Sequence, residues 1–288
     1  MQTSMRYHSR AVLLGAVALL ATRTPGLLAQ VAEGRQVTVN GRAWWLSCTG
    51  TGTPAVVLEA GHTESSDTWR AVQLGVAEFT RVCSYDRAGR GRSGPIPGGS
   101  ERTASDAAGD LATLLRAGNE RGPYVLVGHS LGGPLVRVFA TTVAAQVAGM
   151  VLVDAVHERE FEAIDSLLTP AQRVAGAGMR PMSPERFDIE AILRDVRQRS
   201  RSIPWPLVVV ARGRPLAEDE MPPSWSPAQR QQREQLRRSL QQELAALSRH
   251  GRLVVADSSG HHVHHDQPDV VVTAIRDLVE RHRRASGR

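Results

Sequence analysis

The chain of 288 residues contains no lysine and only two cysteines, and few of its side chains are aromatic. Its 35 basic residues are all arginines, which we interpret as a genome-wide codon bias because no single site needs every cation to be a guanidinium. A nucleic-acid-binding face needs a basic stripe with stacking rings between the charges. Here the arginines are scattered and aromatic residues make up 4% of the chain, so the net charge of +6 does not indicate nucleic-acid binding.

Long hydrophobic runs are also missing. An apolar run at residues 11–21 follows Arg6 and Arg10, but a membrane-spanning helix needs about 20 apolar residues. A basic start, a short apolar core and small residues near position 29 are typical of a secretory signal peptide. We therefore predict that residues 1–29 are a signal peptide or an uncleaved N-terminal anchor. The mature chain is expected to be exported, periplasmic or secreted, with no stable membrane span.

Strand-like runs alternate with helical patterns along the rest of the chain. Residues 35–39 and 44–48 flank Asn40-Gly41, a strong hairpin signal. Further apolar runs, most of them separated by helical patterns, occupy residues 55–59, 81–86, 124–127, 149–153, 206–211 and 253–257. Such alternation favours an α/β fold with a mostly parallel sheet and helices on both faces. We place this single domain at residues 30–288.

The segment of about residues 157–205 is predicted to be a helical cap. It is helical in character, but prolines and glycines interrupt it. A plain connection between two strands is much shorter. We therefore expect an insertion after the sixth strand that covers the strand ends.

The strongest functional signal lies at residues 124–133. A strand-like run leads into Gly128-His129-Ser130-Leu131-Gly132, and a helix-compatible run follows. This G-x-S-x-G pattern is the layout of a nucleophile elbow, where a tight turn between strand and helix exposes a serine. The start of the helix favours negative charge that develops during a reaction. Ser130 is therefore the predicted nucleophile.

Two other patterns resemble cofactor-binding sites. Residues 89–94 match G-x-G-x-x-G, but a proline-rich loop follows where a nucleotide fingerprint would open a helix. Four histidines follow the last strand: His261, His262, His264 and His265. No acid or cysteine near them has a recognised zinc-site spacing. We predict no metal and no organic cofactor, and we expect the last three histidines to lie in a solvated or loosely packed loop.

Four motifs together resemble the α/β-hydrolase family, in particular its esterase- or lipase-like members with a serine nucleophile. They are residues 59–62, 85–93, 128–133 and 260–261, in the order in which the family carries them. The resemblance implies an eight-stranded sheet whose second strand is antiparallel to the others. It also implies a triad in the chain order serine, acid, histidine. His261, which directly follows the turn after the last strand and matches the family's Gly-His pattern, is the predicted base.

The acid and the oxyanion hole are less clearly marked. The family most often carries the acid after the seventh strand, where Asp219 lies, but some members carry it after the sixth, where Asp154 lies. We favour Asp154 and keep Asp219 as the alternative; Asp154 could instead cap the following helix. The oxyanion hole needs two backbone N–H groups. We expect them from Leu131 and from the turn after the third strand, at His62 or Thr63.

The family's strand order also places the second strand beside the fourth, antiparallel. Cys48 lies near the end of the former and Cys83 near the start of the latter. An even cysteine count in an exported protein permits a disulfide. We therefore expect a bond between Cys48 and Cys83.

The predicted reaction is hydrolysis of a small carboxylic ester through an acyl-enzyme. A serine at the elbow argues against relatives that cleave epoxides or carbon–halogen bonds with an aspartate nucleophile. A thioesterase, a peptidase and a cofactor-free perhydrolase would use the same triad. The alternative from another class is a non-catalytic binding protein with this fold.

Overall fold

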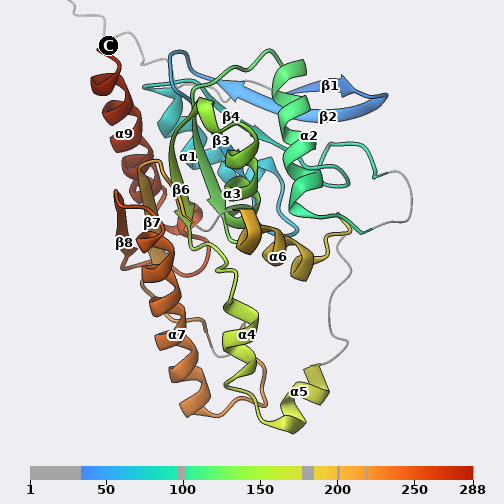
Figure 1. Ribbon diagram of the computed structural model, residues 1–288, viewed down its shortest axis with the longest axis vertical. Coiled ribbons are helices and arrows are strands. Elements are labelled where there is room, and N and C mark those ends of the chain that lie inside the picture. The colour runs from blue at the N-terminus through green and yellow to red at the C-terminus, as the bar shows by residue number, and fades with distance from the viewer. Residues whose placement is uncertain (1–33, 97–100, 177–184, 200–201, 218–219, 288) are drawn as a thin grey trace, which may run out of the picture.

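An eight-stranded sheet forms the centre of the computed structural model, which describes residues 34–96, 101–176, 185–199, 202–217 and 220–287 (Figure 1). Its order is β1-β2-β4-β3-β5-β6-β7-β8. The strands are β1 (Arg35–Val39), β2 (Arg42–Thr49), β3 (Ala55–Glu59), β4 (Val82–Tyr85), β5 (Tyr124–His129), β6 (Val147–Val153), β7 (Leu207–Arg212) and β8 (Gly251–Ala256). β2 pairs antiparallel with β1 and β4, and the other neighbours are parallel. The predicted fold class is confirmed.

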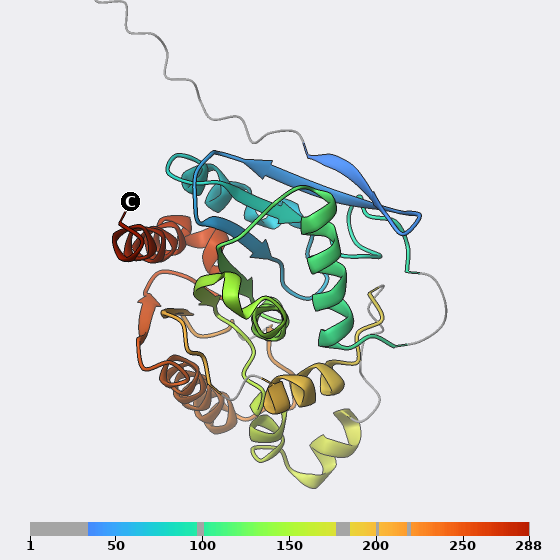
Figure 2. The same cartoon turned by 45° about the horizontal axis from the view of Figure 1, so that its top comes forward.

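Helices cover both faces of the sheet. They are α1 (Arg70–Ala77), α2 (Ala104–Ala117), α3 (Gly132–Thr142), α4 (Glu160–Asp165), α5 (Pro170–Gly176), α6 (Ile189–Arg199), α7 (Pro227–Ala246), α8 (Val263–Asp266) and α9 (Pro268–Ala285), with short 3₁₀ turns at Ser66–Trp69 and Ala144–Gln146. Figure 2 shows α2 and α9 on opposite sides of the sheet. Among the described residues, no helix combines the length and apolar character needed to cross a membrane.

The parallel strands are buried on both faces, so their side chains alternate between two hydrophobic clusters. Val56 and Leu58 of β3 pack in the cluster that contains α1 and α9. Val57, between them, packs in the cluster that contains α2 and α3. Successive side chains of a strand point to opposite faces, which explains why this strand reads as a continuous apolar run.

Helix α7 begins at Pro227, directly after a capping signal in the sequence. Ser226 accepts a hydrogen bond from the Gln229 N–H, and the Gln229 side chain accepts one from the Ser226 N–H. Pro227 stands at the first helical position, where a missing N–H costs nothing. This reciprocal capping box sets the start of the helix that carries Arg237, which lies three turns further on.

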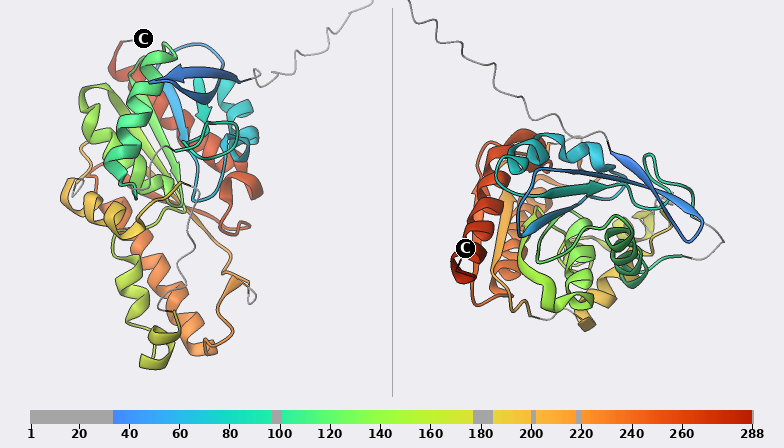
Figure 3. Two further views of the ribbon diagram at one scale, coloured as in Figure 1. Left: turned by 90° about the vertical axis from the view of Figure 1, so that its right-hand side faces the viewer. Right: turned by 90° about the horizontal axis from the view of Figure 1, so that it is seen from above.

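The expected cap region, residues 157–205, divides into two parts. α6 packs against α2 and α3, with Ile192 and Val196 in the same core cluster as those helices. α4 and α5 stand away from the sheet, and α4 contacts α7 there (Figures 1 and 3). α6 is therefore part of the helical layer, while a covering role for α4 and α5 stays a prediction.

A disulfide joins Cys48 and Cys83, which face each other in the antiparallel register of β2 and β4. The bond closes a loop with a sequence separation of 35 residues. The bond is compatible with the export that we predict, whose signal segment at residues 1–29 lies outside the described residues.

Loss of this bond is expected to lower the free energy of unfolding by about 4 kcal/mol, because a cross-link of this span restricts the unfolded chain. Urea unfolding of the oxidised protein and of the double variant Cys48→Ala/Cys83→Ala measures the difference. A thiol assay on the unreduced, unfolded protein should find no free thiol. Two reactive thiols would contradict the pairing.

Candidate active site

Ser130 lies on a sharp turn between β5 and α3, with a backbone φ of +49°. This left-handed conformation is rare for a residue with a side chain and is found where the surrounding structure enforces it. Glycines on either side make the turn feasible. A Cβ on Gly128 would lie 2.4 Å from the carbonyl oxygen of Gly132, and one on Gly132 would lie 2.5 Å from that of Glu59. The elbow is thus wedged against the end of β3, and Ser130 stays partly exposed.

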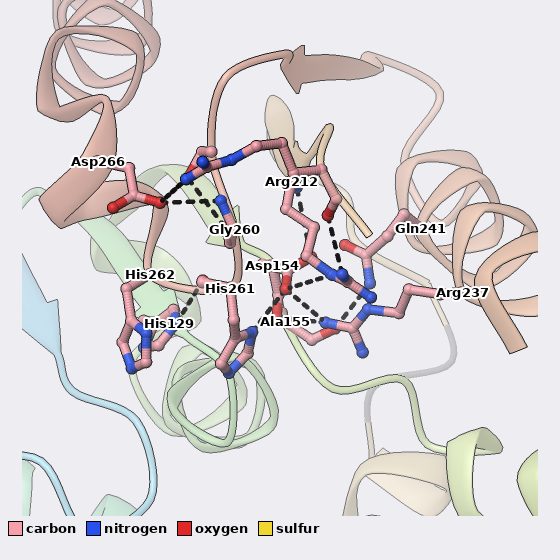
Figure 4. A network of polar contacts seen from close by, with 12 residues as sticks. His129, Asp154, Ala155, Arg212, Arg237, Gln241, Gly260, His261, His262 and Asp266 are labelled. Atoms are coloured by element: carbon pink, nitrogen blue, oxygen red, sulfur yellow. Dashed lines mark hydrogen bonds and ion pairs between the residues drawn. The ribbon is translucent and has the colours of Figure 1, made fainter. Parts of the chain in front are cut away.

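His261 and Asp154 are brought together from segments 107 residues apart in sequence. His261 Nδ1 lies 2.6 Å from Asp154 Oδ2, and the carboxylate is 1% exposed while the ring is 29% exposed. Because an ionised carboxylate can only accept a hydrogen bond, Nδ1 donates to Asp154, and in the neutral ring Nε2 has the lone pair. The ring is therefore oriented as a base (Figure 4).

The loop that carries His261 lies directly beside the elbow. The ring of His129, the residue before the nucleophile, has Nε2 at 3.1 Å from the carbonyl oxygen of His261. The rings of His129 and His261 have centroids 4.7 Å apart. The structure therefore brings the predicted base and the predicted nucleophile to the same end of the sheet, where β5, β6 and β8 finish.

Asp154 itself is the residue directly after β6, and its φ is +39°. Two arginines contact its buried carboxylate: Arg237 Nη2 at 3.2 Å and Arg212 Nε at 3.6 Å. Burial alone would raise the pKa of Asp154. The two guanidiniums and the hydrogen bond from His261 instead hold that pKa well below its usual range, so the group is ionised at neutral pH.

The turn after β3 is held by a buried arginine. Arg87 donates to the carbonyl oxygens of Ala60 and Gly61, at 2.6 Å each, from two nitrogens of its guanidinium. The same guanidinium pairs with Glu59 and with Glu185, and all three side chains are buried. Arg87 thereby fixes the position of both turn carbonyls.

Within that turn, the structure distinguishes the two expected oxyanion donors. The N–H of Thr63 donates to Glu185 Oε2 at 3.3 Å. Gly61 N–H donates to Glu64 Oε2 at 2.7 Å. His62 lies between these two occupied groups, so its N–H is the better candidate to accompany that of Leu131. The oxyanion hole of Leu131 and His62 remains a proposal.

One expectation about the histidine-rich loop is wrong. His262 and His265 are exposed, but His264 is fully buried, with Nε2 at 2.7 Å from Thr68 Oγ1. Burial and the neighbouring histidines lower the pKa of His264, so the ring is neutral. Two short helices explain the difference, because α8 and the turn at Ser66–Trp69 pack against each other. The loop is folded against the body rather than loosely packed.

Glu64, His129 and His264 each place one ligand-type atom within 4.8 Å of the others, so a metal ion could be held there. The Glu64 oxygens are already engaged by Gly61, by His129 Nδ1 at 3.0 Å and by His262 Nε2 at 3.3 Å. Burial raises the pKa of Glu64, but these partners lower it to about 2. An ionised Glu64 thus completes a network without an ion, and its role is to join the turn after β3 to the elbow.

The alternative acid, Asp219, lies outside the described residues. Sequence reasoning missed the arginines around Asp154 and the role of Arg87. Arg237 sits in a Gln/Arg-rich helix where it looks like any solvated cation, and Arg212 ends a buried strand. Arg212 is a charged residue at the end of an otherwise apolar run, and this position was the one sequence signal for an arginine near the acid.

A protein-family model described as "Alpha/beta hydrolase family" matches residues 37–274 of the sequence. An uncharacterized Bacillus subtilis protein, YqjL, is 26% identical over 226 residues, which cover 77% of this chain and 82% of YqjL. A thermophilic esterase from Thermogutta terrifontis superposes with a TM-score of 0.58 at 20% identity, over 87% of this chain and 99% of the esterase. A haloalkane dehalogenase variant from Bradyrhizobium elkanii gives 0.63 at 17% identity, over 88% and 98% of the two chains. At such identities, these two structures show a common fold and not a common reaction.

Proposed function

Because the chain belongs to the alpha/beta hydrolase family, we propose that it is a serine hydrolase that cleaves carboxylic esters through an acyl-enzyme. The observation that carries the proposal is the 2.6 Å contact between His261 Nδ1 and Asp154 Oδ2, in a loop that the His129 ring joins to the elbow. It supports an oriented base near a partly exposed serine, the arrangement that nucleophilic catalysis requires.

In the first half-reaction, Ser130 Oγ attacks the acyl carbon while His261 Nε2 takes the hydroxyl proton. The carbonyl electron pair moves onto oxygen, where the N–H groups of Leu131 and His62 would stabilise it. Collapse of this intermediate breaks the ester C–O bond. The alcohol leaves with the proton from His261 Nε2, and the acyl group stays on Ser130.

In the second half-reaction, water replaces the alcohol. His261 removes a proton from the water as its oxygen attacks the acyl carbon, and a second tetrahedral intermediate forms. Its collapse releases the carboxylic acid and returns the proton to Ser130 Oγ. Asp154 stays ionised throughout and stabilises the imidazolium form of His261 in both halves.

Covalent labelling tests the proposal without knowledge of the natural substrate. A fluorophosphonate should add once per chain, and peptide mass mapping should locate the adduct on Ser130. Pre-unfolded protein is the control and should not react, because the serine is activated only in the folded site. An adduct on another residue would move the nucleophile. No adduct at any concentration would favour the non-catalytic binding protein.

A substrate panel then separates the reactions that share the triad. p-Nitrophenyl esters of increasing acyl length, a thioester, an anilide and a peracid-forming assay should be run side by side. We expect the esters to give the highest kcat/KM. A thioester or anilide turned over faster than every ester would replace the proposed substrate class while keeping the mechanism.

A further inference from the structure

We propose that Arg237 and Arg212 are positioning residues that clamp the carboxylate of Asp154 and set the lowest pH at which His261 can act as a base. The proposal rests on the proposed function, since it assigns both arginines to the acid of that reaction. Neither arginine belongs to the nucleophile elbow or to the histidine-rich loop.

Arg237 holds Asp154 at two points. Its Nη2 donates to the Asp154 carbonyl oxygen at 2.6 Å and lies 3.2 Å from the carboxylate Oδ2 (Figure 4). Nη1 of the same guanidinium pairs with Glu160 Oε2 at 2.5 Å. The carbonyl contact matters because Asp154 has a left-handed φ, a conformation that needs support from its surroundings. Gln241, one turn further along α7, donates to the next carbonyl, of Ala155, at 2.8 Å.

Arg212 approaches the same carboxylate from the end of β7. Its backbone N–H donates to Asp154 Oδ1 at 3.4 Å, and its Nε lies 3.6 Å from Oδ2. Its Nη2 is occupied by Glu234 at 2.9 Å. Oδ2 is therefore shared by three cationic or hydrogen-bonding groups: His261, Arg237 and Arg212.

The charged side chains joined to Asp154 through ion pairs form a cluster with no net charge. Arg212 of β7 and Arg237 of α7 contact the Asp154 carboxylate. Glu234 of α7 and Glu160 of α4 pair with these two arginines, and Arg233 of α7 pairs with Glu234. Together with Asp154, this makes three positive and three negative charges. A proton on His261 therefore adds one net positive charge to this mostly buried cluster.

On its other side, His261 faces His129 and His262, and Glu64 pairs with both of those rings. These groups belong to β5, to the histidine loop and to the turn after β3, and none of them is altered by a change on α7. A change at Arg237 thus acts on His261 from the side of Asp154.

The loss of Arg237 should make His261 easier to protonate. With Arg237 removed, the cluster carries a net negative charge, and the protonated form of His261 becomes more favourable. A base must be unprotonated to accept a proton from serine. The acidic limb of the pH profile of kcat/KM should therefore move to higher pH. We expect a shift of about one pH unit, because solvent partly screens the lost charge of Arg237.

The test compares three variants over pH 4–10 with a p-nitrophenyl ester. Arg237→Gln should move the acidic limb upward and recover most of the wild-type kcat/KM at high pH. Arg237→Lys keeps the charge but loses the planar fork, so its limb should stay with the wild type even if kcat falls. Arg238→Gln, the adjacent exposed residue on α7, removes the same charge away from the cluster and is the matched control.

A fall in kcat/KM by the same factor at every pH in Arg237→Gln would overturn the proposal, since that is the signature of a purely structural role. An unmoved limb would overturn it too. If Arg237→Gln does not fold, Arg212→Gln must show the same upward shift, because its guanidinium faces the same oxygen.

NMR titration of the His261 ring, assigned with a His261→Gln variant, gives a readout that needs no substrate. Its midpoint should rise in Arg237→Gln and stay in Arg238→Gln. A fluorophosphonate adduct on Ser130 with no shift in this midpoint would contradict the positioning role of the arginines and support the proposed function. A shifted midpoint with no adduct on Ser130 would support the effect of the arginines on His261 and contradict the proposed function.

Discussion

Ser130→Ala is expected to lower kcat/KM for a cleavable ester by at least about 10⁴-fold, because the residues of a nucleophilic triad act as a unit and nothing can replace the attacking oxygen. The left-handed φ of +49° at this position is already accommodated by the fold, and alanine adds no atom to the turn. The variant should therefore fold like the wild type. Initial rates on the best ester of the panel and circular dichroism melting measure the two parts of this prediction.

Ser286→Ala is the matched control, since Ser286 is an exposed serine just after the end of α9. It should retain full activity. A Ser130→Ala enzyme, purified to constant activity, that keeps more than about one hundredth of the wild-type rate would place the nucleophile elsewhere.

Asp154→Asn is expected to lower kcat by about 10⁴-fold, the scale found when a triad acid becomes an amide. An asparagine can turn its NH₂ group toward His261 Nδ1, which forces the proton onto Nε2. The ring then presents an N–H to Ser130 instead of a lone pair, and it cannot act as a base. Rates on the same ester, with substrate affinity followed separately through KM, measure the loss.

The same change should also destabilise the fold, because Arg212 and Arg237 lose the charge that compensates them. Removing one partner of a buried ion pair costs roughly 3–5 kcal/mol, so activity must be measured well below the variant's melting temperature. Asp219→Asn is the control for the alternative acid. Near-normal turnover in Asp154→Asn, with a large loss in Asp219→Asn, would move the acid to the loop after β7.

Local sequence was sufficient for the elbow. A strand, a G-x-S-x-G turn and a helix are set by neighbouring residues, and the backbone contacts that exclude a side chain at Gly128 and Gly132 occur within that turn and against β3. The strands were also readable, since double-sided burial leaves a continuous apolar run. The pairing of β2 with β4, and with it the contact of Cys48 and Cys83, needed the family's strand order.

The surroundings of the acid and the base could not be read in the same way. The sequence favoured Asp154 but left Asp219 as an alternative, whereas the fold places the Asp154 carboxylate, directly after β6, 2.6 Å from His261. Arg237 lies 83 residues from Asp154, and Glu185 lies 98 residues from Arg87. Nothing in the spacing of such residues signals that their charges meet in a buried cluster.

The sequence by itself thus determined the class of fold, the elbow that presents Ser130 and the glycine–histidine turn after the last strand, because short-range sterics and strand burial leave local patterns. Only the tertiary structure decided which acid faces His261, which arginines surround that acid and that His264 is buried rather than solvated. The physical reason is that pairing and desolvation of charges depend on distances through space, which β6, β7, α7 and the histidine loop acquire only when they pack together.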